Sequence, residues 1–583
     1  MRRWLLVAAA AVALVVLGAG LVLAYDTAQA RGALQRAEEQ AADLRVQVSN
    51  GEVDAARGVL AQLQDSTDEA ESHTDGPLWN VAARTPLIGQ NFASVQTISR
   101  ALQDISSDGL DPLVDIADQV GAEVFSPQDG RIDVDAVQDV SPGLQSADAA
   151  LTRGWLELRE IDPDGLVGPL QGPVTELQTR VDDARSTVRA GAKAARLIPD
   201  MLGGSDKRSY VLAFQNNAEI RSTGGLPGAF AILNADDGRI SLGRQGAGSE
   251  FPYFADDLPI KPTQDEQRLY SILLTGFWGD TTLTPDFPRA AQIMRAMVRR
   301  ELDRKTDGVI SLDPVALSYI LEATGPVKLS DGTSLTSDNA VKKLLNDVYL
   351  EIPENEAQDA YFADATRRVF GAVVSGKGGS QALLESLAKA AGESRILISS
   401  ARRAEQRTLA STRVGGALAG DRGTTPHVGI FYNDATQAKL EYYLRKRTVV
   451  RATACTRDGA QSLTATTVLR SVAPKNARSL PRSILGTGDR GKPGYFRMIM
   501  TFYAPYGGLV TRLEIDGEEE LVNRVEHDGL NLVSQTILLA PGQKMTVKAS
   551  MFTGKDQRED AVFTTTPGIE ATPNNVTVPS ACR

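Results

Sequence analysis

One short stretch of the chain, residues 214–230, concentrates side chains that can bind a ligand; it reads FQNNAEIRSTGGLPGAF. Arg221 offers a fork of N–H donors that suits phosphate or carboxylate. Four neighbours could orient this guanidinium or supply oxygen ligands to a hard cation: Asn216, Asn217, Glu219 and Thr223. The alternative is a tight connection between two strands in which Glu219 and Arg221 neutralise each other. The chemistry of these residues leaves both options open.

The backbone of this stretch is also unusual. Gly224, Gly225 and Gly228 permit positive φ or the close approach of a ligand, and Pro227 stiffens the return into the next apolar run. The apolar runs SYVLAF and AFAILN flank the polar residues and are typical of strands. We therefore expect a strand-to-strand loop.

The common catalytic and metal motifs do not occur elsewhere. The histidines, His73, His427 and His527, are far apart, and neither His-x-x-x-His nor Cys-x-x-Cys is found. There is no Gly-x-Ser-x-Gly elbow. The sequence therefore indicates no metal site and identifies no catalytic residue.

Length and charge restrict the class of protein. A chain of 583 residues is too long for one core, which predicts roughly two to four domains. The net charge of −11 argues against a nucleic-acid partner, because phosphate binding needs a basic surface.

The N-terminus predicts a membrane anchor over residues 1–26. Arg2 and Arg3 precede about twenty mostly apolar residues, Trp4 to Ala24, enough to cross a hydrocarbon core of about 30 Å. A cleavable signal peptide is the alternative, with a shorter apolar core than this one. We expect a single-pass protein of the cell membrane whose bulk is extracytoplasmic.

The chain has two cysteines, Cys455 and Cys582. In an oxidising compartment a disulfide between them is expected. Two free buried thiols are the alternative.

Hydrophobic periodicity divides the rest of the chain into three regions. Apolar residues at helical spacing predict a helical bundle or stalk over residues 27–200. Strand and helix patterns then alternate over residues 205–412, which is typical of an α/β domain. Strand-like runs separated by turn residues predict a β-sandwich over residues 425–583.

Several motifs resemble a known family. NNAEIRSTGG, a DG hairpin, PDFPRAAQIM, DGVISLDPVALSYILEATGPV and SDNAVKKLLNDVY follow one another in this order. This series resembles a large group of uncharacterised envelope proteins of high-GC Gram-positive bacteria, a "domain of unknown function" family with an NNAE-R-TGG signature. The order of anchor, helical region, signature domain and β-rich tail is similar too.

A second resemblance is to the LytR-CpsA-Psr phosphotransferases, which move glycopolymers from a polyprenyl pyrophosphate carrier onto peptidoglycan. Their Arg-Ser-Asp-Thr element falls on residues 221–224, and their later Asp-x-x-Arg falls on Asp364 and Arg367. The resemblance implies that Arg221, assisted by Arg244, Arg367 and Arg368, grips a phosphate or acidic sugar, with magnesium as the implied cofactor. Thr223 replaces the Asp associated with magnesium.

Two functions follow as hypotheses. The first is an envelope protein of glycopolymer assembly that binds a lipid-linked or anionic glycan. A polyprenyl-linked glycan or a cell-wall polymer would be such a ligand, and phosphotransferase activity is left open. The second is a non-catalytic scaffold that contacts other envelope proteins. Convergence of Arg221, Arg244 and Arg367 on one pocket would favour the first.

Overall fold

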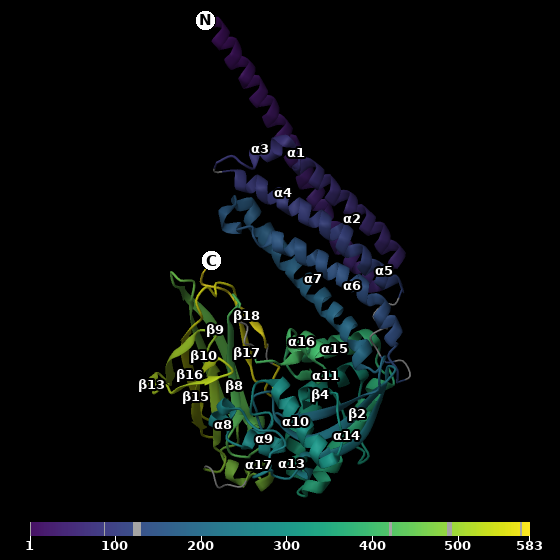
Figure 1. The fold of residues 1–583 in the computed structure, drawn as a ribbon, viewed down its shortest axis with the longest axis vertical. Coiled ribbons are helices and arrows are strands. Elements are labelled where there is room, and N and C mark those ends of the chain that lie inside the picture. The colour runs from purple at the N-terminus through teal and green to yellow at the C-terminus, as the bar shows by residue number, and fades with distance from the viewer. Residues whose placement is uncertain are drawn as a thin grey trace. The chain divides into compact units, whose positions relative to one another are not determined.

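The computed structural model of the protein describes residues 2–86, 88–119, 127, 130–418, 423–486, 492–571 and 574–582, without the side chains of residues 2–18, 49, 118 and 119. The chain divides into two compact units (Figure 1). One comprises residues 1–125 and 133–200, and the other comprises residues 126–132 and 201–583.

The first unit is helical. Its first two helices pair through small and aliphatic residues: Ala37 and Leu44 of α1 pack with Leu60 and Leu63 of α2. The turn between α1 and α2 contains Gly51 at φ 75°, a left-handed conformation that favours glycine. The helices are α1 (Arg2–Asn50), α2 (Val53–Thr74), α3 (Pro77–Ala82), α4 (Gly89–Asp104), η1 (Ile105–Leu110), α5 (Asp111–Gln119), α6 (Val134–Leu158), η3 (Pro163–Gly165) and α7 (Gly168–Met201).

The predicted transmembrane anchor over residues 1–26 needs correction. Within the described part of the chain, no helix is long and apolar enough to cross a membrane. The apolar run begins α1, which continues without a break to Asn50 and buries Ala30, Ala33 and Ala37 in the helical unit. This finding contradicts the anchor, the single-pass topology and the location in the cell membrane.

The second unit begins with a five-stranded sheet of order β3-β2-β1-β4-β7. Strand β1 runs parallel to β4, and the other neighbours are antiparallel. The strands are β1 (Arg208–Asn216), β2 (Leu226–Asp236), β3 (Arg239–Ala247), β4 (Gly308–Leu312) and β7 (Ile396–Ser400).

Helices cover both faces of this sheet because side chains alternate along each strand. In β1, Tyr210 and Leu212 join one hydrophobic core, whereas Val211 and Ala213 join the other. The first core is completed by α11, α14 and α15, and the second by α10. The remaining elements of this domain are η4 (Gly248–Glu250), α8 (Gln264–Tyr270), α9 (Leu273–Gly276), η5 (Trp278–Asp280), α10 (Phe287–Leu302), α11 (Pro314–Thr324), β5 (Val327–Lys328), β6 (Ser334–Leu335), α12 (Ala340–Lys342), η6 (Lys343–Asp347), α13 (Val348–Glu351), α14 (Asn355–Val374), α15 (Ser380–Gly392), α16 (Arg403–Ala410) and η7 (Arg413–Gly415).

A segment predicted to lie in the helical region belongs instead to this domain. The amide of Gly130 donates to the carbonyl of Val374 at 3.0 Å, and that of Ile132 donates to Gly238 at 3.0 Å. Arg131 adds an ion pair with Asp237. Residues 130–132 therefore lie beside the start of β3, the edge strand of the sheet.

The last part of the chain forms two sheets, of order β13-β12-β16-β10-β9 and β14-β15-β11-β8-β17-β18. Alternate residues of β10, among them Leu463 and Ala465, point into a core that also receives Met498 and Phe502 from the other sheet. The elements are β8 (His427–Asp434), η8 (Leu440–Tyr443), β9 (Leu444–Cys455), β10 (Gln461–Ser471), η9 (Ala477–Ser479), α17 (Arg482–Leu485), β11 (Phe496–Tyr503), β12 (Leu509–Ile515), β13 (Glu518–Glu520), β14 (Arg524–His527), β15 (Leu530–Leu539), β16 (Lys544–Phe552), β17 (Ala561–Thr565) and β18 (Val576–Val578).

The predicted disulfide is confirmed. Cys455, at the end of β9, is bonded to Cys582 near the C-terminus, 127 residues further along the chain. The crosslink ties the final segment to the first of these two sheets.

Candidate functional site

The loop between β1 and β2 is folded tightly around one side chain. Gln215 accepts hydrogen bonds from the Thr223 hydroxyl at 3.0 Å and from the Gly225 amide at 2.8 Å. A Cβ on Gly225 would lie 2.2 Å from the carbonyl oxygen of Asn216, and Gly224 has φ 138°. The paired glycines are therefore needed for backbone to pack on backbone.

Arg221 is buried in this loop, with 4% of its surface exposed. Its Nη2 lies 3.0 Å from Asp280 Oδ1, and its Nη1 donates to the backbone carbonyl of Asp434 at 3.2 Å. Burial lowers the pKa of Arg221, but Asp280, Asp434 and Glu219 together raise it above the ordinary value. The guanidinium is thus held as a cation by carboxylates of the protein itself.

The same loop joins the α/β domain to the β-rich domain. The Ser222 amide donates to Asn433 Oδ1 at 2.9 Å, and Thr566 donates to the Ser222 carbonyl at 2.9 Å. The Asp434 amide donates to the Ile220 carbonyl at 2.9 Å. Ile220 and Ser222, in the stretch that was expected to bind a ligand, are therefore hydrogen-bonded to the end of β8.

Beside this cluster lies a buried carboxyl group, that of Glu441 in η8. Within the described part of the chain, neither of its carboxyl oxygens receives a hydrogen bond from another residue. Burial, reinforced by Asp434, raises the pKa of Glu441 well above its ordinary value. Folding therefore favours the protonated form of this carboxyl group.

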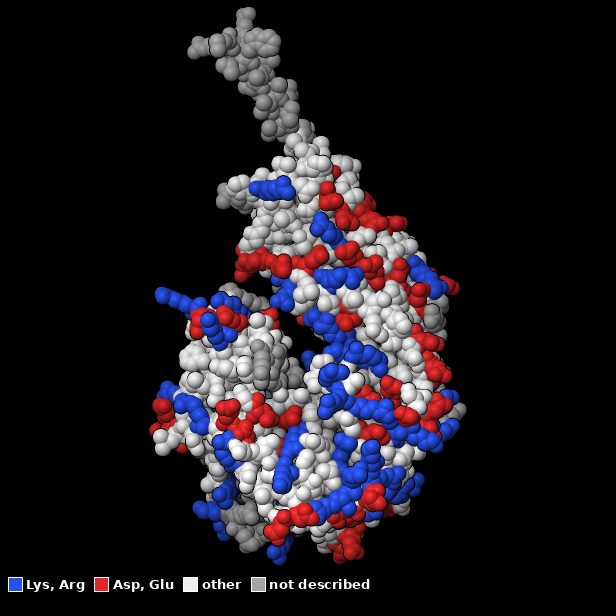
Figure 2. Space-filling model, viewed as in Figure 1, with Lys and Arg blue, Asp and Glu red and all other residues white. Residues whose placement is uncertain are grey.

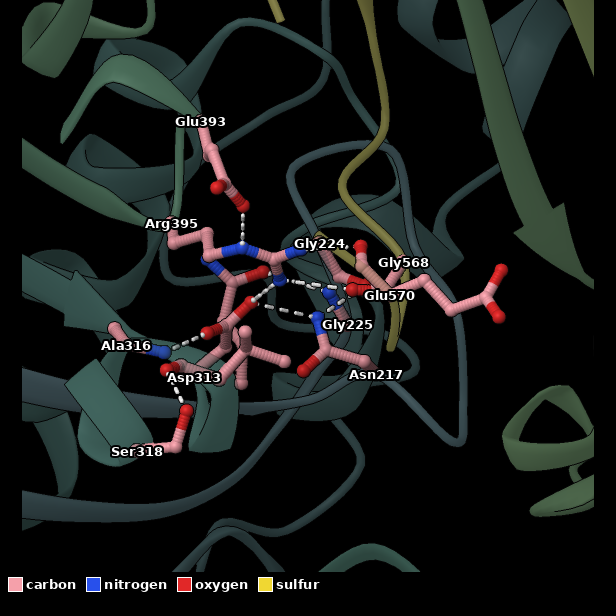
Figure 3. A network of polar contacts seen from close by, with 12 residues as sticks. Asn217, Gly224, Gly225, Asp313, Ala316, Ser318, Glu393, Arg395, Gly568 and Glu570 are labelled. Carbon is pink, nitrogen blue, oxygen red and sulfur yellow. Dashed lines mark hydrogen bonds and ion pairs between the residues drawn. The ribbon is translucent and has the colours of Figure 1, made fainter. Parts of the chain in front are cut away.

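Asn217 belongs to a second buried network (Figure 3). Its Nδ2 donates to Asp313 Oδ2 at 3.0 Å, and Arg395 Nη1 donates to the same oxygen at 2.9 Å. Arg395 also donates to the carbonyls of Gly568 and Glu570. This network is a second connection between the domains. Asp313 and Arg395 are not among the residues that the sequence predicts to bind a ligand.

The assisting arginines of the sequence hypothesis lie elsewhere, on the surface. Arg244 of β3 pairs with Glu250, and its side chain is half exposed. Arg367 and Arg368 of α14 share Asp364, and are also exposed. None of these contacts involves Arg221, so the arginines do not converge on one pocket. Figure 2 shows basic and acidic side chains interspersed over the visible face.

Two of the predicted residues, Asn216 and Glu219, line a cavity of about 320 Å³, here called the apolar cavity. It lies at the carboxyl end of β1 and the start of α11, where open α/β sheets commonly bind ligands. Its apolar walls come from Phe214, Leu226, Phe277, Trp278, Leu317, Leu344, Leu345, Phe362 and Ala365.

The polar side of the apolar cavity is a small hydrogen-bonded group. Lys439 Nζ lies 2.8 Å from Glu219 Oε1 and 4.8 Å from the centre of the Tyr349 ring. Asn216 Nδ2 donates to the Tyr349 hydroxyl at 2.9 Å. Asp359 of α14 also lines the cavity. Among the lining residues that the structure describes, Lys439 is the only cation.

Sequence reasoning missed Lys439, Tyr349 and Asp359. Tyr349 is the last residue of the motif SDNAVKKLLNDVY, but nothing in that motif indicates a contact with the loop, and Asp359 and Lys439 lie in none of the quoted motifs. For metal ions, the residues that the structure describes contain no group of three or more His, Cys, Asp or Glu that could hold one.

Comparison with known proteins gives one finding. A family model described as a protein of unknown function, DUF4012, matches residues 205–349. Neither curated proteins nor solved structures gave a match. The matched range runs from just before β1 to Tyr349 and includes the whole β1–β2 loop. Residues 205–349 of this chain form a DUF4012 domain.

Proposed function

We propose that this protein binds an amphipathic, lipid-linked glycan, with the lipid part in the apolar cavity and the sugar at its polar side. The observation that carries this proposal is the composition of the cavity. Apolar side chains make up most of its walls, and the polar group of Asn216, Glu219, Tyr349 and Lys439 lies among them.

The size and place of the cavity support a small ligand. A volume of about 320 Å³ lies at the lower end of the roughly 300–1,000 Å³ common for ligand sites. Glu219, Lys439 and Asn216 present both donors and acceptors, as sugar hydroxyls require. The distant resemblance to the LytR-CpsA-Psr phosphotransferases, whose substrate is a glycan linked to a lipid carrier, suggests this class of ligand.

The proposal does not include phosphoryl transfer. Arg221, the residue that the resemblance assigns to the phosphate, has protein carboxylates as partners and is buried. At the polar side of the apolar cavity, Lys439 is opposed by Glu219 and Asp359, so the charge there does not favour a pyrophosphate.

Isothermal titration calorimetry with n-octyl β-glucoside, below its micelle concentration, tests the proposal. We expect saturable binding, little response to glucose alone, and at least roughly tenfold weaker binding by Ala365→Leu, which fills the cavity. Ala360→Leu is the matched control, because Ala360 is exposed on the same helix.

Equal binding by the Ala365→Leu and Ala360→Leu variants would refute the proposal. Absence of any binding would favour the second candidate, a non-catalytic scaffold. Two observations favour that candidate: Arg221, Arg244 and Arg367 do not converge on one pocket, and the β1–β2 loop joins two domains.

A further inference from the structure

The second unit contains another cavity, of about 680 Å³, on the other side of the β1–β2 loop. Asn216 and Glu219 of this loop line the apolar cavity, whereas Ser222 and Thr223 line this one. Further parts of its wall come from β8, β17 and β18 and from the chain between α16 and Leu418. We call it the hydroxyl-lined cavity.

The chemistry of this cavity differs from that of the first. Hydroxyl and amide side chains occur around it, among them Ser394, Ser411, Thr412, Asn575 and Thr577. Hydroxyl and amide groups can in general both donate and accept hydrogen bonds. Ser411 and Thr412 already donate to the carbonyls of Thr408 and Leu409, so they would accept hydrogen bonds from a ligand. Apolar side chains, among them Leu397, Val428 and Phe431, make up the larger part of the wall. Such a lining suits a molecule that carries many hydroxyl groups on a compact apolar frame, as a sugar does.

Part of the wall is fixed in place. Asn575 has φ 53°, and its Nδ2 donates to the Ser394 hydroxyl at 3.0 Å. Its Oδ1 accepts a hydrogen bond from Thr564 at 2.9 Å. These bonds connect the β-rich domain to the turn before β7, so the two domains form one preorganised wall.

The charged side chains of the lining indicate which class of sugar would bind. The lining residues that the structure describes include Arg413 but neither aspartate nor glutamate. Arg413 is exposed, and no hydrogen bond or ion pair engages its guanidinium within the described part of the chain. A guanidinium in this state is available to bind a carboxylate with two parallel hydrogen bonds.

We propose that the hydroxyl-lined cavity is a second binding site, which takes a short acidic saccharide. Arg413 binds a sugar carboxylate, and the serine, threonine and asparagine side chains bind hydroxyl groups. This site is independent of the apolar cavity, because different residues line the two cavities. The proposal therefore does not depend on whether an alkyl glycoside binds in the apolar cavity.

The test is calorimetry of the whole chain with three probes: trigalacturonic acid, the neutral trisaccharide maltotriose, and citrate. We expect trigalacturonic acid to bind, and Arg413→Gln to weaken this binding at least roughly tenfold. Arg403→Gln is the matched control, since Arg403 is exposed on α16 and does not line the cavity.

A further variant, Thr577→Val, removes a hydroxyl from the wall and is expected to weaken the binding of trigalacturonic acid severalfold. The proposal would be overturned by no binding of trigalacturonic acid, by equal binding by the Arg413→Gln and Arg403→Gln variants, or by equal affinity for maltotriose. Binding of citrate as tight as that of the saccharide would reduce the site to a general anion site and also overturn it.

Discussion

Arg221 shows how a residue suited to ligand binding can be used for structure instead. Its guanidinium is sealed between Asp280 and Asp434, from two different domains. Removal of one partner from a buried ion pair leaves an uncompensated charge, and this costs far more than the pair itself contributes. Arg221 is therefore expected to influence folding more than binding.

The first prediction concerns this residue. Arg221→Met is expected to lower the free energy of unfolding by about 3–5 kcal/mol, because Asp280 and Asp434 lose their cation. Arg244→Met is the control and should cost about 1 kcal/mol or less, since its ion pair with Glu250 is exposed. Urea unfolding measures both variants. An Arg221→Met variant as stable as the control would contradict the structural role.

Glu441 gives the second prediction, on pH dependence. Its folded pKa is raised by burial, so the folded state keeps a proton that the unfolded state loses above about pH 4.5. The stability from this group is present below the unfolded pKa and is lost as the pH rises toward the folded pKa. Between the unfolded and the folded pKa of Glu441, the free energy of unfolding of Glu441→Gln should therefore rise relative to that of the wild type by up to about 1.4 kcal/mol per pH unit.

The measurement is urea unfolding between pH 5 and pH 8. Glu518→Gln serves as the control because Glu518 is exposed on β13, and its difference from the wild type should stay nearly constant. If the difference between Glu441→Gln and the wild type is also independent of pH, the buried carboxyl group is not neutral in the fold.

At the scale of elements, the β1–β2 loop is shaped by its glycines. Gly225 has no room for a side chain, because a Cβ would collide with the backbone of Asn216, whereas a Cβ on Gly228 would meet only Leu226 at 3.9 Å. Gly225→Ala should therefore destabilise the protein by about 1–3 kcal/mol or more. Gly228→Ala, the control, should cost less. Thermal unfolding compares the two, and equal losses would show that the loop can adapt.

Several elements could be predicted from the sequence because local signals mark them. The apolar runs around the loop are β1 and β2, the Asp-Gly turn after β2 leads into β3, and both cysteines pair. The strands and the turn depend on residues close together in the chain. The two cysteines can form only one pair.

Other features could not be predicted, because contacts distant in sequence decide them. The partners of Arg221 are 59 and 213 residues away, and Lys439 reaches the apolar cavity from the β-rich domain. The apolar N-terminus was mistaken for a separate anchor, although it begins a longer helix. Residues 130–132 join the sheet through backbone bonds that no side-chain pattern reveals.

At the scale of the whole molecule, the α/β domain and the β-rich domain form one unit. The β1–β2 loop connects them at β8, and Arg395 connects them at residues 568–570 (Figure 3). The two cavities lie on either side of that loop. The loop therefore holds the walls of both cavities in place while it contributes polar groups to each.

The most direct test of the central claim is photocrosslinking with an octyl glucoside that carries a diazirine in its alkyl chain, followed by peptide mapping by mass spectrometry. Our account predicts crosslinks in α11 and α14, near Leu317 and Phe362, that excess unlabelled octyl glucoside suppresses. Crosslinks that avoid both helices, or that unlabelled octyl glucoside does not suppress, would contradict it.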